Sequence, residues 1–547
     1  MALRQLSLLG SRGATLRRNV IIDGISQDQR RRARAKRSPK AAVGVSATST
    51  RLFHPSAKRE MLPVIGGAIA VAALATGLRY LVRAGKRMRE MEAEEKRRGG
   101  GAGGGGSGGV DSGGGGPGDA SHSNGPAFGV DVGVTNLRLA FANSVEMRPE
   151  VVENREGSRW TPACVSFKGD GDPVVGTMAK GQRFEAAATT MLGMQPLVGL
   201  PFSDPVVQAM AAASGVDGLG GGVIDKAVGG LAGFRIGEGS NVLSAQEGLS
   251  LMLANIRGLA EHKVRAGGAA VLSCPAYFNE HQREAVALAG EHAGMVVLDT
   301  IEEPVAAVMA ADEMGLPLGG GRSTGRLVAV LDVGGRTAQC SIVDAGIKGE
   351  GERPSLVGTD WTAETGGDQW DAGIVDLLDD EFRMANGGLS LKGDDMARGR
   401  SRLMDGSWVP IVLPSPADSL FDAATAARVE LTRAQQAHVN IPFITADRTG
   451  PKHLDVILTR AKIDRAMEPL LRMAEAPCVS ALSMAQVDPS AISSVLLVGG
   501  CSRMPALQDL AKKVFGRAGA GPVLTPEQGD EFVALGAALE ARHMVYE

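Results

Sequence analysis

Two similar segments decide the fold: Phe128-Gly129-Val130-Asp131-Val132-Gly133-Val134-Thr135-Asn136 and Val328-Ala329-Val330-Leu331-Asp332-Val333-Gly334-Gly335-Arg336-Thr337. Each has an apolar run, an aspartate, glycine and a threonine, and a second apolar run follows at 139–141 or 340–343. This pattern predicts a β-hairpin in each place. Glycine lets backbone N–H groups approach an anion, threonine adds a hydroxyl donor, and aspartate can hold hydrated Mg²⁺. The sequence therefore predicts two phosphate-binding turns.

The two turns lie about 200 residues apart, which predicts two lobes that close over one ligand. A third glycine turn, Gly499-Gly500, follows the apolar run 494–498 and precedes a predicted helix. A strand that ends in glycines at a helix start suits close backbone approach to a nucleoside or its α-phosphate. Arg503 is then placed to stack its guanidinium on a purine.

Composition excludes several classes of protein for the body of the chain. The 547 residues carry a formal net charge of -3, so there is no electrostatic case for nucleic-acid binding. The five cysteines contain no C-x-x-C pair, which argues against a disulfide framework or a zinc site. The 75 glycines exceed what uniform globular packing uses and indicate a glycine-rich segment.

Residues 1–60 are predicted to be a mitochondrial presequence. The first 40 residues hold nine arginines against two aspartates, the Arg-rich and acid-poor pattern of a transit peptide. The segment 51–56 (RLFHPS) resembles a signal found near presequence cleavage sites. A basic disordered tail and a nuclear signal at 30–37 remain as alternatives.

Residues 61–83 are predicted to be a transmembrane anchor. The run 61–78 is uncharged and mostly apolar, and a basic flank follows it. That flank predicts an inner-membrane protein whose large domain faces the matrix; a buried core helix is the alternative. The segment 68–84 faintly resembles the N-terminus of the membrane-bound J-protein of the import motor. Residues 84–126 are predicted to be a charged stretch and a flexible glycine-rich linker.

The rest of the chain, 127–547, resembles the ATPase domain of the 70-kDa heat-shock chaperones. Three segments carry the resemblance: 270–310 (beginning AVLSCPAYFNEHQR), 444–462 (ITADRTGPKHLDVILTRAK) and 495–510 (VLLVGGCSRMPALQDL). The stretch 445–454 looks like the bacterial and mitochondrial branch. The resemblance implies an α/β, actin-like ATPase fold with two RNase-H-like lobes, ATP or ADP with Mg²⁺ in the cleft, and J-protein and nucleotide-exchange partners.

The same resemblance assigns roles to individual residues. It implies that Asp131, Asp332, Glu303 and Thr337 are catalytic, the three carboxylates holding Mg²⁺ through bound water. It implies that the following residues bind the nucleotide: Gly133, Thr135, Gly334, Gly335, Gly366, Gly367, Arg428, Thr432, Gly499, Gly500, Arg503, Met504 and Asp530.

Several positions depart from the family pattern where the chemistry occurs. Gln195 falls where the family has its catalytic lysine, and a neutral amide cannot stabilise the charge of phosphoryl transfer. Val134 replaces a loop threonine, Arg336 replaces a loop glycine, and Gln339 replaces an acid. Glu302 and Thr425 also differ from the usual residues. Arg336 supplies the missing charge in one interpretation; in the other, the cleft binds ATP but barely hydrolyses it.

We therefore expect a membrane-tethered, ATP-binding chaperone or co-chaperone that hydrolyses ATP slowly and assists protein folding or import. No substrate-binding domain is expected after the ATPase domain. A pseudo-ATPase scaffold for protein partners is the alternative. A sugar kinase on the same fold is disfavoured because those enzymes lack segments such as 276–283 and 497–505.

Overall fold

The computed structural model describes residues 126–546 except 145, 168–171, 184–185, 187–188, 214–221, 237–240, 265–268, 320–324, 347–351, 364, 392–399, 403–407, 411–415 and 517–518. The predicted presequence, the predicted anchor and all but the last residue of the predicted linker lie outside these residues. No helix within the described ranges is long and apolar enough to span a bilayer.

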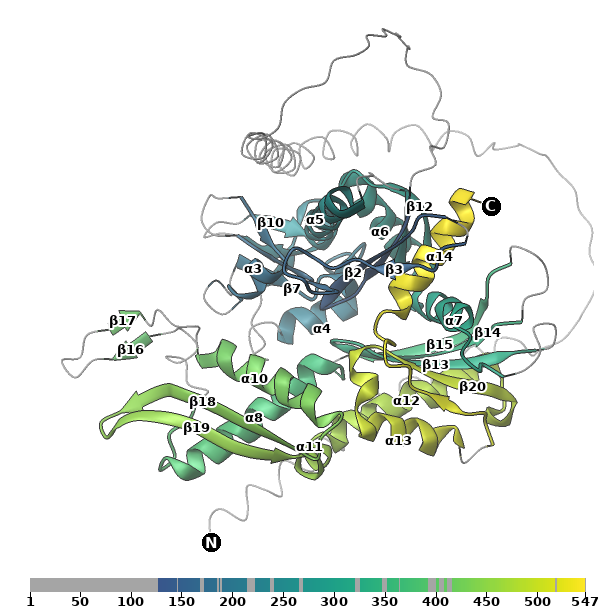
Figure 1. Ribbon diagram of the computed structural model, residues 1–547. Coiled ribbons are helices and arrows are strands. Elements are labelled where there is room, and N and C mark those ends of the chain that lie inside the picture. The colour runs from purple at the N-terminus through teal and green to yellow at the C-terminus, as the bar shows by residue number, and fades with distance from the viewer. Residues whose placement is uncertain are drawn as a thin grey trace, which may run out of the picture. The chain divides into compact units, whose positions relative to one another are not determined.

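Two sheets, one of six strands and one of five, form the centre of the described residues (Figure 1). Read from opposite ends, their main paths have equivalent strand orders. The first has the order β12-β11-β1-β2-β3 and the second the order β15-β14-β13-β20-β21. The strands of the first sheet are β1 (Ala127–Val132), β2 (Asn136–Ala142), β3 (Glu150–Val151), β11 (Ala269–Cys274) and β12 (Val296–Glu302), with β4 (Thr161–Pro162) also paired to β2. Those of the second are β13 (Leu327–Val333), β14 (Thr337–Asp344), β15 (Ser355–Ala363), β20 (Ile492–Val498) and β21 (Val523–Leu524).

Both predicted hairpins are present at the centres of these sheets. Strand β1 is antiparallel to β2 and parallel to β11, and β13 is antiparallel to β14 and parallel to β20. The turns of both hairpins therefore lie at the carboxyl ends of central strands, where α/β proteins bind ligands. The mixed sheets and helices fit an actin-like ATPase fold. We call the part built on the first sheet the first lobe and the part built on the second sheet the second lobe.

Two helices, α7 (Glu303–Glu313) and α14 (Phe532–Tyr546), pack between the sheets. Alanines and valines of both helices share a core with residues of β1, β11, β13 and β20. Glycines set their distance of approach, because a Cβ at Gly129 of β1 would lie 2.0 Å from the backbone of Ala538. A Cβ at Gly536 would likewise lie 1.9 Å from the carbonyl oxygen of Ala306. This small-residue layer joins the two sheets closely.

The other helices cover the outer faces. Helices α5 (Ala245–Val264) and α6 (Glu280–His292) pack on the first sheet through the alternating apolar side chains of β1. Helix α6 begins with a capping box in which Asn279 and Gln282 satisfy each other's backbone N–H. The second sheet is covered by α8 (Gly367–Ala385), α12 (Glu468–Ala485) and α13 (Pro505–Val514).

Smaller elements complete each lobe. The first lobe adds the sheet β6-β5-β7 and the sheet β10-β9-β8. The strands of these two sheets are β5 (Cys164–Ser166), β6 (Val174–Val175), β7 (Thr190–Leu192), β8 (Ile224–Lys226), β9 (Ala232–Arg235) and β10 (Val242–Ser244). The short helices of the same region are α3 (Thr177–Lys180), η3 (Gln195–Leu197), α4 (Pro205–Ala213) and η4 (Val228–Gly230). The second lobe adds β16 (Arg400–Arg402), β17 (Trp408–Pro410), α10 (Pro416–Leu431), β18 (Gln436–Asp447), β19 (Gly450–Thr459), α11 (Arg460–Ala466), η5 (Pro489–Ala491) and η6 (Gly500–Arg503).

Candidate functional site

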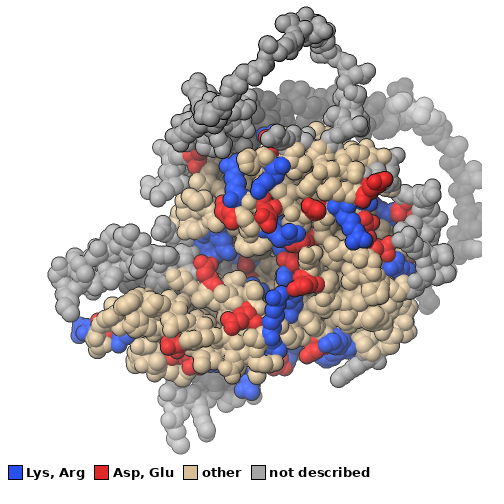
Figure 2. All heavy atoms as spheres, in the orientation of Figure 1, with Lys and Arg blue, Asp and Glu red and all other residues tan. Residues whose placement is uncertain are grey.

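A cleft of ≈ 600 Å³ opens between the two lobes. This volume is in the range that holds a small-molecule ligand or cofactor. Both hairpin turns, the Gly499-Gly500 turn and helix α10 contribute to its walls. In Figure 2, basic and acidic side chains gather around a hollow in the middle of the face. Charged side chains therefore line a cleft whose walls include the three glycine turns.

Fifteen of the seventeen residues assigned by sequence line this cleft. Gly366 and Met504 do not: both are buried behind its wall. Gly366 packs against the second turn, where a Cβ would lie 2.4 Å from the backbone N of Arg336. Met504 is fully buried in the core of the second lobe. The structure places these two residues behind the lining of the cleft, and their contact with a nucleotide stays a prediction.

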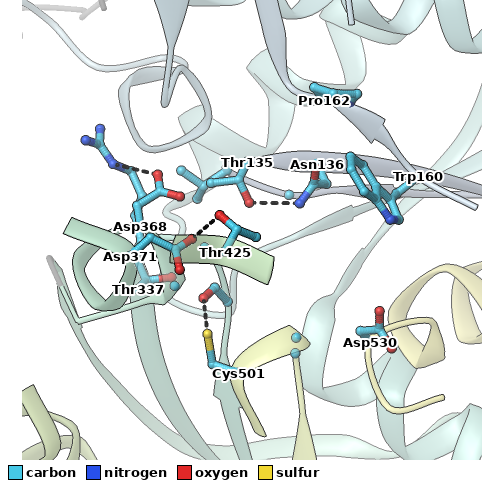
Figure 3. Close-up of a pocket in the computed structure, with 18 of the residues that line it drawn as sticks. Thr135, Asn136, Trp160, Pro162, Thr337, Asp368, Asp371, Thr425, Cys501 and Asp530 are labelled. Carbon is cyan, nitrogen blue, oxygen red and sulfur yellow. Dashed lines mark hydrogen bonds and ion pairs between the residues drawn. The ribbon is translucent and has the colours of Figure 1, made fainter. Parts of the chain in front are cut away.

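The two hairpin turns meet at the centre of the cleft. A Cβ at Gly335 would lie 2.2 Å from Oγ1 and 2.2 Å from Cγ2 of Thr135, so only glycine lets these turns touch. The backbone of Gly335 also accepts from the Asp368 N–H at 2.7 Å, and Gly334 accepts from the Gly367 N–H at 3.0 Å. Figure 3 shows Thr135 and Asn136 between Asp368 and Asp371 on one side and Trp160 on the other. The N-terminus of α8 thus fixes the second turn against the first.

Three carboxylates, Asp131, Asp332 and Glu303, line the floor of the cleft. Burial, followed by the neighbouring charge of Asp131, raises the pKa of Asp332 to about 7. Burial and then the charges of Asp332 and Asp131 hold the pKa of Glu303 well above its usual value. Burial also raises the pKa of Asp131, against the lowering effect of Arg138. A floor of mutually repelling buried acids favours a bound cation.

Gln195 reaches this floor from η3. Its side-chain amide donates to the Val132 carbonyl oxygen at 2.6 Å and to Glu303 Oε1 at 3.2 Å. Its own Oε1 is buried, and so is the hydroxyl of Tyr277; within the described ranges neither atom has a hydrogen-bond partner. Burial and then Glu303 and Asp332 raise the pKa of that hydroxyl, which places it near the same acids. Buried polar groups of this kind are ordinarily satisfied by water or ligand.

These residues fit a hydrated magnesium ion. Among the described residues, no group of three or more histidine, cysteine or acidic side chains is arranged to hold a metal directly. Mg²⁺ usually keeps several of its waters in phosphate sites and needs only one or two carboxylates. The unsatisfied Gln195 Oε1 and Tyr277 hydroxyl supply hydrogen-bond partners for such waters. The donor set is therefore appropriate for Mg²⁺ held through water.

Arg336 extends from the second turn toward the first lobe. A Cβ at Gly193 would lie 2.8 Å from its Nη1, and its Nε lies 3.5 Å from Asp368 Oδ2. Burial raises the pKa of Asp368 to about 6, against the lowering effect of Arg336. Arg336 therefore lies close to the loop that carries Gln195, with Asp368 as an ion-pair partner.

The family model for the Hsp70 protein matches residues 127–407 and 413–545. The chain belongs to the Hsp70 family. Hsp70 ATPase domains bind ATP or ADP with Mg²⁺, and the family consists of chaperone-type ATPases that usually work with J-proteins and nucleotide-exchange factors. The match spans both lobes and every residue of the cleft.

The far end of the cleft holds the residues that the Hsp70 resemblance assigns to the nucleoside. Arg428 makes a bidentate pair with Asp371 at 2.7 and 3.1 Å, and Thr425 donates to the same carboxylate at 2.8 Å. The Arg428 side chain also contacts Cys501 Sγ at 3.6 Å. Arg428 is thus held by Asp371, an acid that sequence reasoning missed. Thr432 lies at the exposed edge of the cleft.

Arg138 is the most informative residue that the sequence reasoning missed. It lies opposite Asp131 in the β1–β2 pairing, with Nη1 3.3 Å from Asp131 Oδ2. Its Nη2 lies 3.1 Å from Asp530, which pairs in turn with Arg503 at 2.6 Å. The hairpin register could have revealed the first contact, since residues facing each other across a predicted hairpin are neighbours.

Trp160, Lys180 and Arg183 also line the cleft without having been predicted. The Lys180 Nζ lies 6.0 Å from the Trp160 ring, at the edge of cation–π range. Arg183 lies over the Phe421 ring of the other lobe at 5.6 Å. No motif in the sequence marks these residues, because their place depends on how the two lobes meet.

Proposed function

We propose that this chain is a slow ATP hydrolase of the Hsp70 type that binds ATP or ADP with Mg²⁺ in the interlobe cleft. The observation that carries the proposal is the meeting of Thr135 and Gly335 above the floor of Asp131, Asp332 and Glu303. Two glycine turns facing each other supply backbone N–H groups for phosphate oxygens from both sides. This arrangement suits a polyphosphate better than a sugar or a peptide.

In this proposal each group has a stated task. The turns at Gly133 and Gly334 bind the β- and γ-phosphates, and Thr135 and Thr337 add hydroxyl donors. Asp131, Asp332 and Glu303 hold the hydrated metal, and the metal neutralises phosphate charge. Arg503 packs against the purine, with Asp530 fixing its guanidinium at 2.6 Å.

Slow turnover follows from Gln195. Its amide is fixed between Val132 O and Glu303 in the place that the family gives to a lysine. A neutral group there cannot offset the charge that develops on the transferred phosphoryl, and loss of one such contact costs on the order of 10² or more in rate. Arg336, the other candidate cation, is ion-paired with Asp368.

The test is single-turnover hydrolysis of labelled ATP by the wild type and by Gln195→Lys. We expect the lysine to raise the rate on the order of 10²-fold, since it restores the missing charge beside Glu303. Lys226, an exposed lysine on β8 outside the cleft, serves as a control through Lys226→Gln, which should leave the rate unchanged. Equal rates for the wild type and Gln195→Lys would show that this charge does not limit turnover.

A pseudo-ATPase scaffold is the second candidate, and Gln195 is the observation that favours it. The nucleotide would then only hold the lobes in the shape that a protein partner recognises. Tight ATP binding without turnover, and without stimulation by a J-protein, would support the scaffold. Turnover that a J-protein accelerates would support the chaperone ATPase.

We further propose a bacterial or mitochondrial type of Hsp70, tethered to the inner mitochondrial membrane with its ATPase domain in the matrix. The Arg-rich segment 1–60 and the apolar segment 61–83 support this location. Folding or import of proteins near that membrane is the corresponding role. Protease treatment of isolated mitoplasts is the test: the C-terminal domain should be protected, and its digestion would refute the matrix orientation.

A further inference from the structure

The β1–β2 hairpin places an arginine beside the first acid of the cleft floor. Arg138 and Asp131 face each other in the antiparallel register, and their side chains pair at 3.3 Å. Both are nearly buried, with side-chain exposures of 12% and 10%. An ion pair held by a hairpin at low exposure keeps its geometry and is weakly screened by salt.

The same arginine continues to the nucleoside end of the cleft. Its Nη2 pairs with Asp530 at 3.1 Å, and Asp530 pairs with Arg503 at 2.6 Å. The series Asp131–Arg138–Asp530–Arg503 therefore alternates in charge along one side of the cleft. Two acids and two guanidinium groups balance each other, so this side presents no net charge to an anion.

Arg138 retains donors for a ligand. A guanidinium has five N–H groups and no acceptor. Nη1 of Arg138 donates to Asp131 and Nη2 donates to Asp530, so each of these nitrogens keeps a second N–H. Arg138 itself lines the cleft. Such a group is suited to phosphate oxygens, because guanidinium binds them through paired N–H donors.

Three arginines of the cleft are paired with acids other than the floor carboxylates, and Lys180 lies beside the Trp160 ring. Arg428 pairs with Asp371, Arg336 with Asp368, and Arg183 with Asp422. Among the ion pairs of the described residues, Arg138 is the cation that pairs with one of the three floor carboxylates, Asp131. With Gln195 neutral, Arg138 is the side chain that offsets the negative charge of Asp131.

We propose that Arg138 acts as a built-in cation that makes nucleotide binding only weakly dependent on Mg²⁺. This inference rests on the proposed function of the cleft as an ATP and ADP site. Without a metal, the carboxylates of the floor repel a polyphosphate. Arg138 removes the part of that repulsion that is due to Asp131, and it donates to phosphate oxygens directly. Mg²⁺ therefore adds less to the affinity for nucleotide than it would if Asp131 had no cationic partner.

The experiment is calorimetric titration of the purified full chain with ADP, once with Mg²⁺ and once with excess EDTA. For the wild type we expect the affinity to fall less than about tenfold when EDTA replaces Mg²⁺. For Arg138→Met we expect near-normal affinity with Mg²⁺ but a loss on the order of 10²-fold in EDTA, the size of one charged phosphate contact. Arg138→Lys keeps the charge and should lie between these two.

Arg159→Met is the matched control. Arg159 pairs with Glu531, the neighbour of Asp530, at 2.5 Å but does not line the cleft. Its substitution should leave the ratio of affinities in Mg²⁺ and EDTA at the wild-type value. Melting curves of the nucleotide-free variants show whether each is folded.

The outcomes separate the two proposals. A wild type that loses about 10²-fold or more in EDTA overturns the role of Arg138, whatever the variants do. So does an Arg138→Met protein that binds ADP in EDTA as well as the wild type. Absence of binding by the wild type even with Mg²⁺ would instead refute the nucleotide site itself.

Discussion

At the scale of single residues, Gln195 shows how the cleft accommodates a neutral side chain among acids. Its amide nitrogen donates to Val132 O and Glu303, and its carbonyl oxygen is buried and accepts from none of the described residues. An unsatisfied buried acceptor costs about 1–3 kcal/mol, which a bound water or ligand would recover. Gln195 Oε1 is therefore an acceptor whose partner a bound water or ligand would supply.

The contact between the turns gives the first prediction. Gly335→Ala should destabilise the nucleotide-free protein by about 1–3 kcal/mol, because its Cβ would meet Thr135 at 2.2 Å and force the turns apart. Gly334→Ala is the control, since its Cβ would have no neighbour nearer than 4.0 Å. Urea unfolding measures both. Equal stability of the two variants would show that the turns do not touch in solution.

The buried acids give a second prediction, on pH. The pKa of Asp332 is raised from 3.8 to about 7, chiefly by burial and then by Asp131, so the folded state holds this proton more tightly than the unfolded state. Its contribution to stability is therefore present at low pH and is lost as pH rises from about 4 to about 7. Because asparagine does not titrate, the free energy of unfolding of Asp332→Asn without metal should fall less between these pH values than that of the wild type.

The measurement is urea unfolding in EDTA at a series of pH values. Asp509, exposed on α13 and paired with Lys512, provides the control variant Asp509→Asn. The control should follow the wild-type curve. A curve for Asp332→Asn that is parallel to the wild type would contradict a raised pKa for Asp332.

At the scale of elements, α14 is informative because it packs on β1, a strand that lies far earlier in the chain. Its small residues lie against β1 and α7, and Gly129 and Gly536 remove the Cβ atoms that would keep them apart. Local propensity does not favour glycine within a helix. Its use here reflects close packing rather than a turn.

Gly536→Ala is accordingly expected to cost about 1–3 kcal/mol or more, because the new methyl would meet the Ala306 backbone at 1.9 Å. Helix propensity alone would predict a small gain. Gly325→Ala, whose Cβ would meet nothing within 4 Å, should be nearly neutral. Chemical denaturation of both variants decides the matter. A stabilised Gly536→Ala protein would show that the helices are further apart.

At the scale of the whole ATPase unit, side chains of the two lobes meet at several places among the described residues. Tyr277 of the first lobe stacks on Trp361 of the second, with ring centroids 4.1 Å apart and planes 14° from parallel. Arg183 of the first lobe pairs with Asp422 of α10 at 3.6 Å. The lobes are therefore held by one layer of helices and by discrete contacts that rotation would break.

A double-mutant cycle on Tyr277→Leu and Trp361→Leu tests the stack. We expect a coupling energy of about 0.5–1.5 kcal/mol by urea unfolding, the usual value of an aromatic pair. Tyr277→Leu combined with Trp370→Leu is the control, because Trp370 is buried in the core of the second lobe. The effects of these two substitutions on the free energy of unfolding should be additive. Coupling near zero for Tyr277 and Trp361 would mean that the lobes separate in solution.

Sequence by itself determined the fold class, the two hairpins and those residues of the cleft that its glycine turns contain. Hairpins and their turns are specified locally, since glycine, threonine and apolar alternation act within a few residues. The two turns could therefore be located from the Asp-x-Gly pattern at Asp131 and Asp332 and the threonine that follows each. The Hsp70 family, with its ATP and magnesium chemistry, follows from the same segments and from the match over 127–407 and 413–545.

Only the tertiary structure decided how charges far apart in the chain are paired. Asp530 meets Arg138 across 392 positions of sequence, Arg428 is held by Asp371, and Met504 and Gly366 lie behind the wall rather than in it. Such contacts depend on how α8, α10 and α14 pack, which no local pattern encodes. The reason is physical: side-chain ion pairs are set by the positions of whole elements, whereas turns are set by the residues that form them.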